Sequence, residues 1–457
     1  MLIRFFAENF LSFNENVEFS MIPGASRNLP HHVIKGEKYS DFNILKTGVI
    51  YGANASGKSN LIKAIAFSRK FITQSLKPNQ TIPIRAFKLK NSDKKVTKIE
   101  FEFKYKKKFF AYGFTLDSEK VHDEWLYKIN KKNEKLIFER KTVRNADIEV
   151  TFGIDFKHKE NKKRLMYIAK DALPNQLFLT VCNERNVKNI KEVTPILEAY
   201  HWFDDILTII FPESKYISLE FEITDNEELT YLISKYLKHF DTGINGIELV
   251  ELDFEKDIHD IPNEIKNEIK NEILKNLEPG EKALISVPTA LSYALHKCKN
   301  DKILAYKLMT KHKRRDEKED ILFDIQEESD GTQRLMDLIP ALIKLSKEGG
   351  VYLVDELDRS LHPKISREFI RLFLENTKNT NSQLIVTTHE SSLLDLKQLR
   401  KDEIWFVTKN EYGESSIYSL EEFKPRYDKE IRRGYLQGRF GAVPLIDELD
   451  EIIFNGN

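Results

Sequence analysis

The chain has 457 residues, of which 41% are hydrophobic, so it can build a sizeable core spread over two or three domains. Basic and acidic residues both number 72, and this neutral balance gives no global indication of a nucleic acid or an anionic membrane as partner. Two distant cysteines, Cys182 and Cys298, exclude a disulfide framework and a zinc-finger or zinc-hook site, and suit a reducing cytosol. The N-terminus lacks a signal-peptide pattern and no apolar run approaches the roughly 20 residues of a membrane helix, so we expect a cytoplasmic protein with no membrane partner.

The pattern of apolar residues predicts an α/β protein. Strand-like runs cover the first 20 residues and much of 83–152, where they predict an antiparallel layer. The segment from about 160 to 240 is mainly helical in pattern, and strand-like runs resume after about 302. Around the motifs discussed below, we expect strands at 47–52, 351–356 and 383–390 and helices at 59–72, 332–347 and 363–377.

A phosphate-binding loop is indicated by "GANASGKS", which fits GxxxxGK[ST] and lies between an expected strand and an expected helix. Its glycines let backbone N–H groups turn toward phosphate oxygens, and the helix N-terminus adds a positive dipole. We expect Lys58 to reach the β- and γ-phosphates of ATP and Ser59 to ligate Mg²⁺. The predicted nucleotide-binding residues are Gly52, Asn54, Ala55, Ser56, Gly57, Lys58, Ser59 and Asn60.

A second motif, "GGVYLVDELDRSLHP", places two carboxylates at the end of an apolar strand. Asp355 at that position can reach hydrated Mg²⁺, and Glu356 can polarise an attacking water as a general base. The alternative, an acidic strand end that only faces solvent, is weakened by the presence of the phosphate loop. A third stretch, "ESDGTQRLMDLI", puts Ser329 and Gly331 at the start of an amphipathic helix, which is an anion site or an ordinary helix cap.

These motifs resemble the RecF/SMC-like branch of ABC ATPases over roughly residues 1–70 and 320–445. SDGTQ is similar to the LSGGQ signature at Ser329, Gly331 and Gln333, but differs from it at Asp330 and Thr332. With "VDELDRSLHP", "TTHESSLLD" and "GYLQGRFGAVP", the pattern is similar to ATPases of bacterial phage-defence and abortive-infection operons, such as those of the PARIS and AbiL systems.

The resemblance implies a head-to-tail dimer or larger homo-oligomer, in which ATP lies between the phosphate loop of one copy and the signature of another. It also implies that His389 is the switch histidine that contacts the γ-phosphate and orients the water. Asp358 corresponds to the D-loop aspartate that crosses the dimer interface. A glutamine loop is expected as well, but Gln74 and Gln80 are candidates by position only, and the loop stays unassigned.

The expected fold class is α/β, a two-lobe ABC-type P-loop ATPase domain with an antiparallel β layer and a helical insertion. Expected boundaries are 1–171 for the N-terminal lobe, 172–300 for a mainly helical insertion, 301–423 for the C-terminal lobe and 424–457 for a tail. We expect the insertion to carry oligomer or partner contacts. Its apolar stretch "HWFDDILTIIF" fits a core segment better than an interface.

Three functions are compatible with such an ATPase. A transporter ATPase is disfavoured because the phosphate loop and the signature are about 270 residues apart. A RecF-like DNA-repair or DNA-clamping ATPase is the alternative, since basic stretches at 104–110, 157–164, 311–315 and 424–439 are able to contact nucleic acid, although each also fits a solvated surface. The favoured function is a sensor or scaffold of an anti-phage system that controls a separate effector, such as a TOPRIM-type nuclease from the same operon. No nuclease segment is recognisable in this chain.

Overall fold

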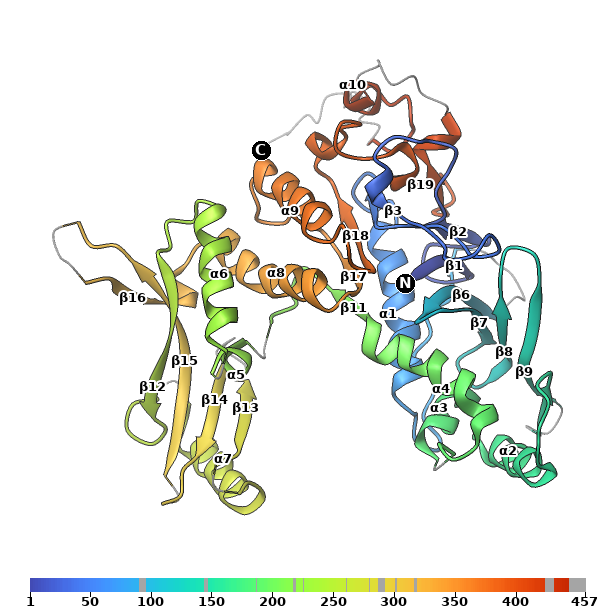
Figure 1. Cartoon of the computed structure of the whole chain (residues 1–457), viewed down its shortest axis with the longest axis horizontal. Coiled ribbons are helices and arrows are strands. Elements are labelled where there is room, and N and C mark those ends of the chain that lie inside the picture. The colour runs from blue at the N-terminus through green and yellow to red at the C-terminus, as the bar shows by residue number, and fades with distance from the viewer. Residues whose placement is uncertain are drawn as a thin grey trace, which may run out of the picture. The chain divides into compact units, whose positions relative to one another are not determined.

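The computed structural model describes residues 1–89, 96–143, 147–185, 187–216, 219–224, 226–259, 261–278, 280–286, 292–300, 302–315, 319–423 and 431–443. The chain divides into two compact units, and Figure 1 labels many of their helices and strands. The first unit consists of Met1–Phe211, Glu348–Asp358 and Ser366–Asn457, and the second of Pro212–Lys347 and Arg359–Ile365.

A mixed sheet in the first unit has the strand order β11-β17-β18-β5-β19-β20, and its neighbouring strands run parallel except for the last pair. These strands are short apolar runs, and every residue of β5 and β18 is buried, as is typical of parallel strands covered on both faces. The loops after β5, β17 and β18 therefore emerge at the same edge of the sheet. The bounds are β5 (Thr47–Tyr51), β11 (Leu207–Ile210), β17 (Gly350–Val354), β18 (Ser382–Thr388), β19 (Ile404–Lys409) and β20 (Ser415–Ser419).

The antiparallel layer predicted from the sequence is confirmed, with the strand order β10-β9-β8-β7-β6-β1-β2. β1 pairs with β2 on one side and with β6 on the other, so the two N-terminal strands lie at one edge of this sheet. The bounds are β1 (Leu2–Glu8), β2 (Val17–Ser20), β6 (Thr97–Tyr105), β7 (Lys108–Leu116), β8 (Val121–Ile129), β9 (Glu134–Thr142) and β10 (Ile148–Phe152).

The two sheets of the first unit share one hydrophobic core. The buried side chain of Gln383 joins them directly, because its amide accepts from Leu2 N over 2.6 Å and donates to the carbonyl oxygens of Leu2 and Leu45, each over 2.9 Å. Trp202 stacks on Phe103 within this core, with ring centroids 4.4 Å apart. The segment "HWFDDILTIIF" is thus core, as expected.

Helices and short elements complete the first unit. α1 (Lys58–Thr73) buries an apolar face that includes Leu61, Ile62 and Ile65, and α9 (Pro363–Asn376), which begins in the second unit, is strongly amphipathic. The other elements are η1 (Pro30–His32), β3 (Val33–Ile34), β4 (Ile44–Leu45), α2 (Lys159–Asp171), α3 (Phe178–Glu184), η3 (Lys191–Val193), α4 (Thr194–His201), η4 (Trp202–Ile206), η6 (Ser391–Leu393), η7 (Lys401–Glu403), η8 (Leu420–Phe423) and α10 (Ile431–Leu436).

The second unit differs from the helical insertion expected at 172–300. It contains a sheet of order β12-β15-β14-β13, with β16 also pairing with β15, and it extends to Lys347. Residues 172–211 belong to the first unit, because β11 pairs with β17 and Trp202 lies in that core. The bounds are α5 (Leu219–Ile223), α6 (Glu227–His239), β12 (Gly246–Asp253), α7 (Asn263–Asn276), β13 (Lys282–Ser286), β14 (Ser292–Lys297), β15 (Ile303–His312), β16 (Ile321–Asp324), η5 (Ile325–Glu327) and α8 (Asp330–Lys347).

α8 is the amphipathic helix predicted after the SDGTQ motif. Leu335, Ile339, Leu342 and Leu345, which recur every three or four residues along the helix, are all buried. The helix packs against α6. The expected tail at 424–457 contains α10, and residues 424–430 and 444–457 lie outside the described ranges. In the part of the chain that is described, no helix has the length and apolar character needed to cross a bilayer.

Candidate active site

The loop after β5 closes around the ammonium group of Lys58. Lys58 Nζ donates to the carbonyl oxygens of Gly52 and Ala53 over 2.8 and 3.0 Å. α1 begins at Lys58 with Gly57 at its N-cap, so the N–H groups of the first helical turn and the loop form a nest suited to phosphate oxygens. Asn54 and Ala55 are exposed at the tip of the loop. The predicted phosphate-loop residues are therefore brought together.

Glycine is required at two positions of this loop. A Cβ atom on Gly52 would lie 2.5 Å from the carbonyl oxygen of Val407 in β19. Gly57 has a φ of 113°, and a Cβ atom there would lie 2.3 Å from Ser415 Oγ. Any other residue would therefore force the loop away from β19 and β20.

Two serines that the sequence analysis missed hold the phosphate loop in place. Ser415 Oγ lies 2.6 Å from the carbonyl oxygen of Ser56 and 2.8 Å from Ser12 Oγ. Asn60 Nδ2 donates to Ser12 Oγ over 2.7 Å. The loop and the first turn of α1 are thereby linked to the segment after β1 and to β20. Neither Ser12, within "NFLSF", nor Ser415, at the start of "SSIYSL", belongs to a motif, so the sequence carries no clear signal for these contacts.

Asp355 follows β17 and is buried next to the start of α1. Ser59 Oγ donates to Asp355 Oδ1 over 3.1 Å, and Thr387 Oγ1 donates to the same oxygen over 2.6 Å. The contact with Ser59 joins the two motifs that the sequence analysis paired. Thr387, on β18, was not predicted to take part.

The oxygen atoms of Ser59 and Asp355 fit a magnesium ion in their chemistry, because Mg²⁺ prefers hydroxyl, carboxylate, water and phosphate oxygens. Within the described ranges, no three His, Cys, Asp or Glu side chains gather as a metal-binding group. A divalent cation here would therefore be held by Ser59, Asp355, water and the phosphates of the nucleotide.

Glu356 has an unusual backbone conformation at the point where the general base is predicted. Its φ of 49° lies in the left-handed region, which costs a residue with a side chain roughly 1–2 kcal/mol. Its backbone N–H donates to Thr387 Oγ1 over 2.8 Å, which helps to fix this conformation. Backbone strain of this kind is often concentrated at functional sites.

His389 lies beside the phosphate-loop lysine, with 3.3 Å between His389 Nδ1 and Lys58 Nζ. Burial and the charge of Lys58 lower the pKa of His389, so a neutral imidazole can accept a hydrogen bond from the ammonium group. Burial also lowers the pKa of Lys58 to about 8, against the opposing charges of Asp355, Asp358 and Glu356. The ammonium group of Lys58 is therefore partly shielded from water and lies close to three carboxylates.

Asp358 belongs to the same cluster. The backbone N–H of His389 lies 3.3 Å from each carboxylate oxygen of Asp358, within the same chain. This contact positions the segment that carries the histidine. The expected role of Asp358 across a dimer interface stays a prediction.

The signature residues lie in the second unit, at the start of α8. Ser329 is exposed, its hydroxyl accepts from Thr332 N over 3.2 Å, and its carbonyl oxygen accepts from Gln333 N over 2.9 Å. Gln333 Nε2 donates to the carbonyl oxygen of Glu328 over 2.9 Å. A Cβ atom on Gly331 would lie 2.6 Å from the carbonyl oxygen of Ser360, so this turn requires glycine.

Neither glutamine considered for the glutamine loop has a contact that supports that role. Gln74 is the C-cap of α1, at the opposite end of this 16-residue helix from Lys58. At 1.5 Å per residue, the two positions are about 24 Å apart. Gln80 Oε1 accepts from Lys77 N over 2.8 Å in a local turn. The glutamine loop therefore stays unassigned.

A groove of about 810 Å³ opens beside the first turn of α1. Ser12 and Asn60 line it, together with the segment Ile84–Leu89, Lys409 and Gly413. It mixes apolar and basic side chains and adjoins the residues that hold the phosphate loop.

The fold and this cluster together define a P-loop ATPase. The chain matches the family described as "AAA domain, putative AbiEii toxin, Type IV TA system" over residues 49–156 and 173–395, which is more than half of its length. The chain therefore belongs to this AAA-domain family. A comparison with curated proteins finds no match.

Solved structures of SMC head domains are similar to this chain at low sequence identity. The head domain from Thermotoga maritima is 13% identical, covers 92% of this chain and 98% of its own, and has a TM-score of 0.36. An SMC head bound to the C-terminal winged-helix domain of ScpA is 14% identical, covers 93% and 99%, and has a TM-score of 0.41. A Pyrococcus furiosus head with an extended coiled coil, bound to the C-terminal domain of ScpA, is 13% identical with the same coverage and a TM-score of 0.40.

Proposed function

We propose that this protein is an ATP-dependent switch whose working site is composed from two copies of the chain in a head-to-tail dimer or larger homo-oligomer. The observation that carries the proposal is the start of α8. Ser329 is exposed there, and Gly331 leaves no room for a side chain. An exposed hydroxyl and a helix N-terminus suit the γ-phosphate of a nucleotide bound by another copy.

Within one copy, each residue of the cluster has a distinct role in the proposed reaction. Lys58 binds the β- and γ-phosphates, and Ser59 and Asp355 hold Mg²⁺, which neutralises charge on the phosphates when bound. Glu356 accepts a proton from the attacking water, and His389 orients that water against the γ-phosphate. The groove beside Ser12 and Asn60 receives the adenosine part of ATP. Positioning and electrostatics are sufficient for such phosphoryl transfer, because little covalent chemistry is asked of the protein.

In the cell, we propose that the ATP-bound assembly restrains a separate effector of an anti-phage, abortive-infection system and releases it on infection. The family description names a putative AbiEii toxin of a type IV toxin–antitoxin system, and this supports a role in defence. A nuclease encoded by a neighbouring gene is the favoured effector.

Mixing two inactive variants tests the composite site. Lys58→Ala destroys the phosphate loop, and Ser329→Arg blocks the signature. A mixed dimer of the two carries one pocket with an intact phosphate loop from one chain and an intact signature from the other. After mixing under conditions that allow subunit exchange, we expect roughly a quarter of the wild-type ATPase activity to return with random pairing.

The controls for this experiment are each variant alone and a mixture of Lys58→Ala with the double variant, which has no intact pocket in any pairing. If the mixture of single variants stays as inactive as its components although mixed dimers form, the composite site is wrong.

The defence role has its own test. Phage plating is compared in cells that carry the chain alone, its neighbouring gene alone, and both genes, with Glu356→Gln as the matched inactive variant. Protection that requires both genes and an intact Glu356 supports the proposal. If deletion of the gene for this chain makes cells sensitive to DNA damage and leaves phage plating unchanged, the RecF-like alternative is favoured.

A further inference from the structure

A loop between two short strands of the first unit comes shortly before β5 and the phosphate loop in sequence. β3 and β4 pair as an antiparallel hairpin, and residues 35–43 connect them. The loop is ordered by its own polar contacts: Asp41 Oδ2 accepts from Lys38 N, and Asn43 Oδ1 accepts from Gly36 N, each over 3.0 Å. It is also tied to the turn between β8 and β9, because Lys131 N donates to the carbonyl oxygen of Ser40 over 3.0 Å.

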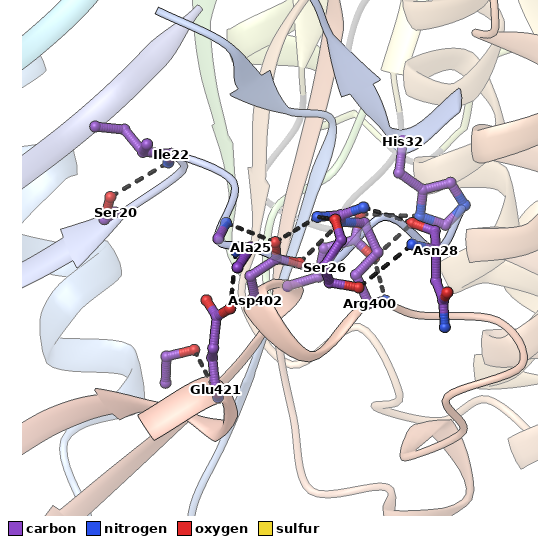
Figure 2. A network of polar contacts seen from close by, with 12 residues as sticks. Ser20, Ile22, Ala25, Ser26, Asn28, His32, Arg400, Asp402 and Glu421 are labelled. Carbon is purple, nitrogen blue, oxygen red and sulfur yellow. Dashed lines mark hydrogen bonds and ion pairs between the residues drawn. The ribbon is translucent and has the colours of Figure 1, made fainter. Parts of the chain in front are cut away.

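The chain that leads into this hairpin is fixed by the buried side chain of Arg400. Figure 2 shows its guanidinium group between the carboxylate of Asp402 and the backbone near Ser26 and Asn28. His32 Nδ1 and Glu403 Oε1, both buried, lie 2.9 Å apart at the base of the hairpin. These contacts, of which those made by Arg400 are charge-assisted, hold the segment from about residue 24 to 32 in one conformation.

A groove of about 740 Å³ runs along this segment. Basic side chains that line it include Arg27, Lys35, Lys38, Lys131 and Arg400, of which the first four are exposed. Glu37 also lines the groove, but it forms an ion pair with Lys107 at 3.2 Å. The groove therefore presents an excess of positive charge, which attracts phosphate groups.

Tyr39 adds an aromatic surface to this groove. Its side chain is 88% exposed, and its contact with the rest of the protein includes Lys132, whose Nζ lies 5.5 Å from the ring centroid. Because the ring is exposed, packing in the core does not explain why an aromatic residue occupies position 39. An exposed tyrosine next to several lysines is the combination on which unpaired bases stack while the cations follow the phosphate backbone.

We propose that this groove binds single-stranded nucleic acid. Lys35, Lys38, Lys131 and Arg27 contact successive phosphates, and Tyr39 stacks on a base. Single strands are favoured over a duplex because stacking on Tyr39 needs a base that is free of its partner strand. The ordered loop and its fixed base keep these groups in position before binding, which lowers the entropic cost of association.

The experiment measures binding of fluorescein-labelled oligo(dT) and oligo(U) to the full chain at several KCl concentrations. The charge-reversal variant Lys35→Glu/Lys38→Glu is compared with Lys162→Glu/Lys163→Glu, which makes the same charge change on exposed residues of α2. We expect the first variant to weaken binding by about tenfold or more and to reduce the slope of log K against log salt by about 1.4, since each neutralised phosphate contributes about 0.7 for single strands. The control variant should bind like the wild type.

Stacking is tested separately with Tyr39→Ala, matched by Tyr412→Ala, which truncates another exposed tyrosine of the first unit. We expect Tyr39→Ala to weaken binding about five- to tenfold, as is typical for loss of one stacked base, and Tyr39→Phe to retain wild-type affinity. ATPase activity without nucleic acid should be the same in all four chains, so this test does not depend on the proposed composite site.

Three outcomes would overturn the proposal. In the first, both charge-reversal variants weaken oligonucleotide binding equally. In the second, a duplex of the same length binds as tightly as the single strand or more tightly. In the third, polyglutamate competes for the groove as strongly as unlabelled oligonucleotide does. The last result would mean that the groove takes acidic proteins instead. The comparison of oligo(dT) with oligo(U) separates DNA from RNA as the ligand.

Discussion

Thr387 Oγ1 donates a hydrogen bond of 2.6 Å to Asp355 Oδ1, and the two residues lie on adjacent parallel strands or directly after them. The same hydroxyl accepts the backbone N–H of Glu356 over 2.8 Å. One side chain on β18 thus contacts the carboxylate of Asp355 and the backbone of Glu356, the two acidic residues that follow β17, although no role was predicted for it from the sequence.

Replacing this hydroxyl should impair catalysis without removing nucleotide binding. Thr387→Val keeps the shape of the side chain but removes one hydrogen bond to Asp355 Oδ1 and leaves Glu356 N without Thr387 Oγ1 as its acceptor, which costs about 1–3 kcal/mol of stability. We expect kcat to fall about tenfold or more while the Kd for ATP changes little. Thr387→Ser restores the hydroxyl and should recover most of the rate. A valine variant with wild-type kcat would show that the contact does not position the catalytic carboxylates.

Loss of the predicted general base should separate binding from hydrolysis. In Glu356→Gln, we expect ATP to bind and the assembled, ATP-bound state to accumulate, while phosphate release falls by about 10²–10⁴-fold. Steady-state phosphate release and size-exclusion chromatography with ATP measure the two effects. Glu411→Gln, an exposed position in the turn between β19 and β20, is the neutral control. Hydrolysis at the normal rate would reject Glu356 as the base.

The phosphate-loop lysine should be required for nucleotide binding. Lys58→Ala removes a charged donor to the phosphates, and we expect ATP to bind about 100-fold more weakly or not at all. Lys63→Ala, on the exposed face of the same helix, should bind ATP like the wild type. Fluorescence titration with a labelled ATP analogue measures both, and thermal unfolding without nucleotide checks that both variants are folded.

The affinity for ATP should fall as the pH rises above 8. Burial holds the pKa of Lys58 at about 8, so the ammonium group is charged below that pH and increasingly neutral above it. Bound phosphates favour the charged form and raise this pKa, so binding takes up a proton and its affinity drops by up to about tenfold per pH unit above 8. Titrations at pH 7, 8 and 9 measure the trend. Lys58→Arg stays charged throughout and should show little dependence on pH. The same steep fall in the arginine variant would assign it to another group.

The tether between the phosphate loop and β20 should affect nucleotide affinity. Ser415→Ala removes the hydroxyl next to the Ser56 carbonyl oxygen and Ser12 Oγ, at a cost of about 1 kcal/mol. We expect the Kd for ATP to rise about fivefold with little change in kcat. Ser416→Ala, at the next position of β20, where the side chain is exposed on the opposite face, is the matched control. Equal affinities in the two variants would mean that the loop keeps its shape without the tether.

The sequence was most informative where the chemistry is local. The phosphate loop and the carboxylates after β17 each lie within a stretch of about ten residues, with the strand and helix that position them alongside. Their spacing therefore predicted which residues the fold brings together. The contact between Ser59 and Asp355 was implied by the pairing of the two motifs.

Contacts between segments that are far apart in the chain could not be predicted from the sequence. Ser12 and Ser415 are 403 positions apart and meet only because β1 and β20 flank the phosphate loop. The pairing of strands into the sheet of the second unit was not predicted, for the same reason. β12 and β15 each have a strand-like pattern, but their pairing joins residues such as Leu249 and Leu308, and periodicity carries no information about partners so far apart.

The left-handed backbone at Glu356 means that a substitution there is expected to affect folding through the backbone and ATP hydrolysis through the side chain. In a library of all substitutions at this position, we expect the yield of folded protein and the ATPase rate to follow different rankings of residues. Glycine, asparagine and aspartate relieve or tolerate the conformation, so these proteins should accumulate well although they lack a glutamate side chain. Valine and isoleucine resist it and should lower yield as well as turnover. A strained glutamate at the position proposed for the general base would mark where stability has been given up for chemistry.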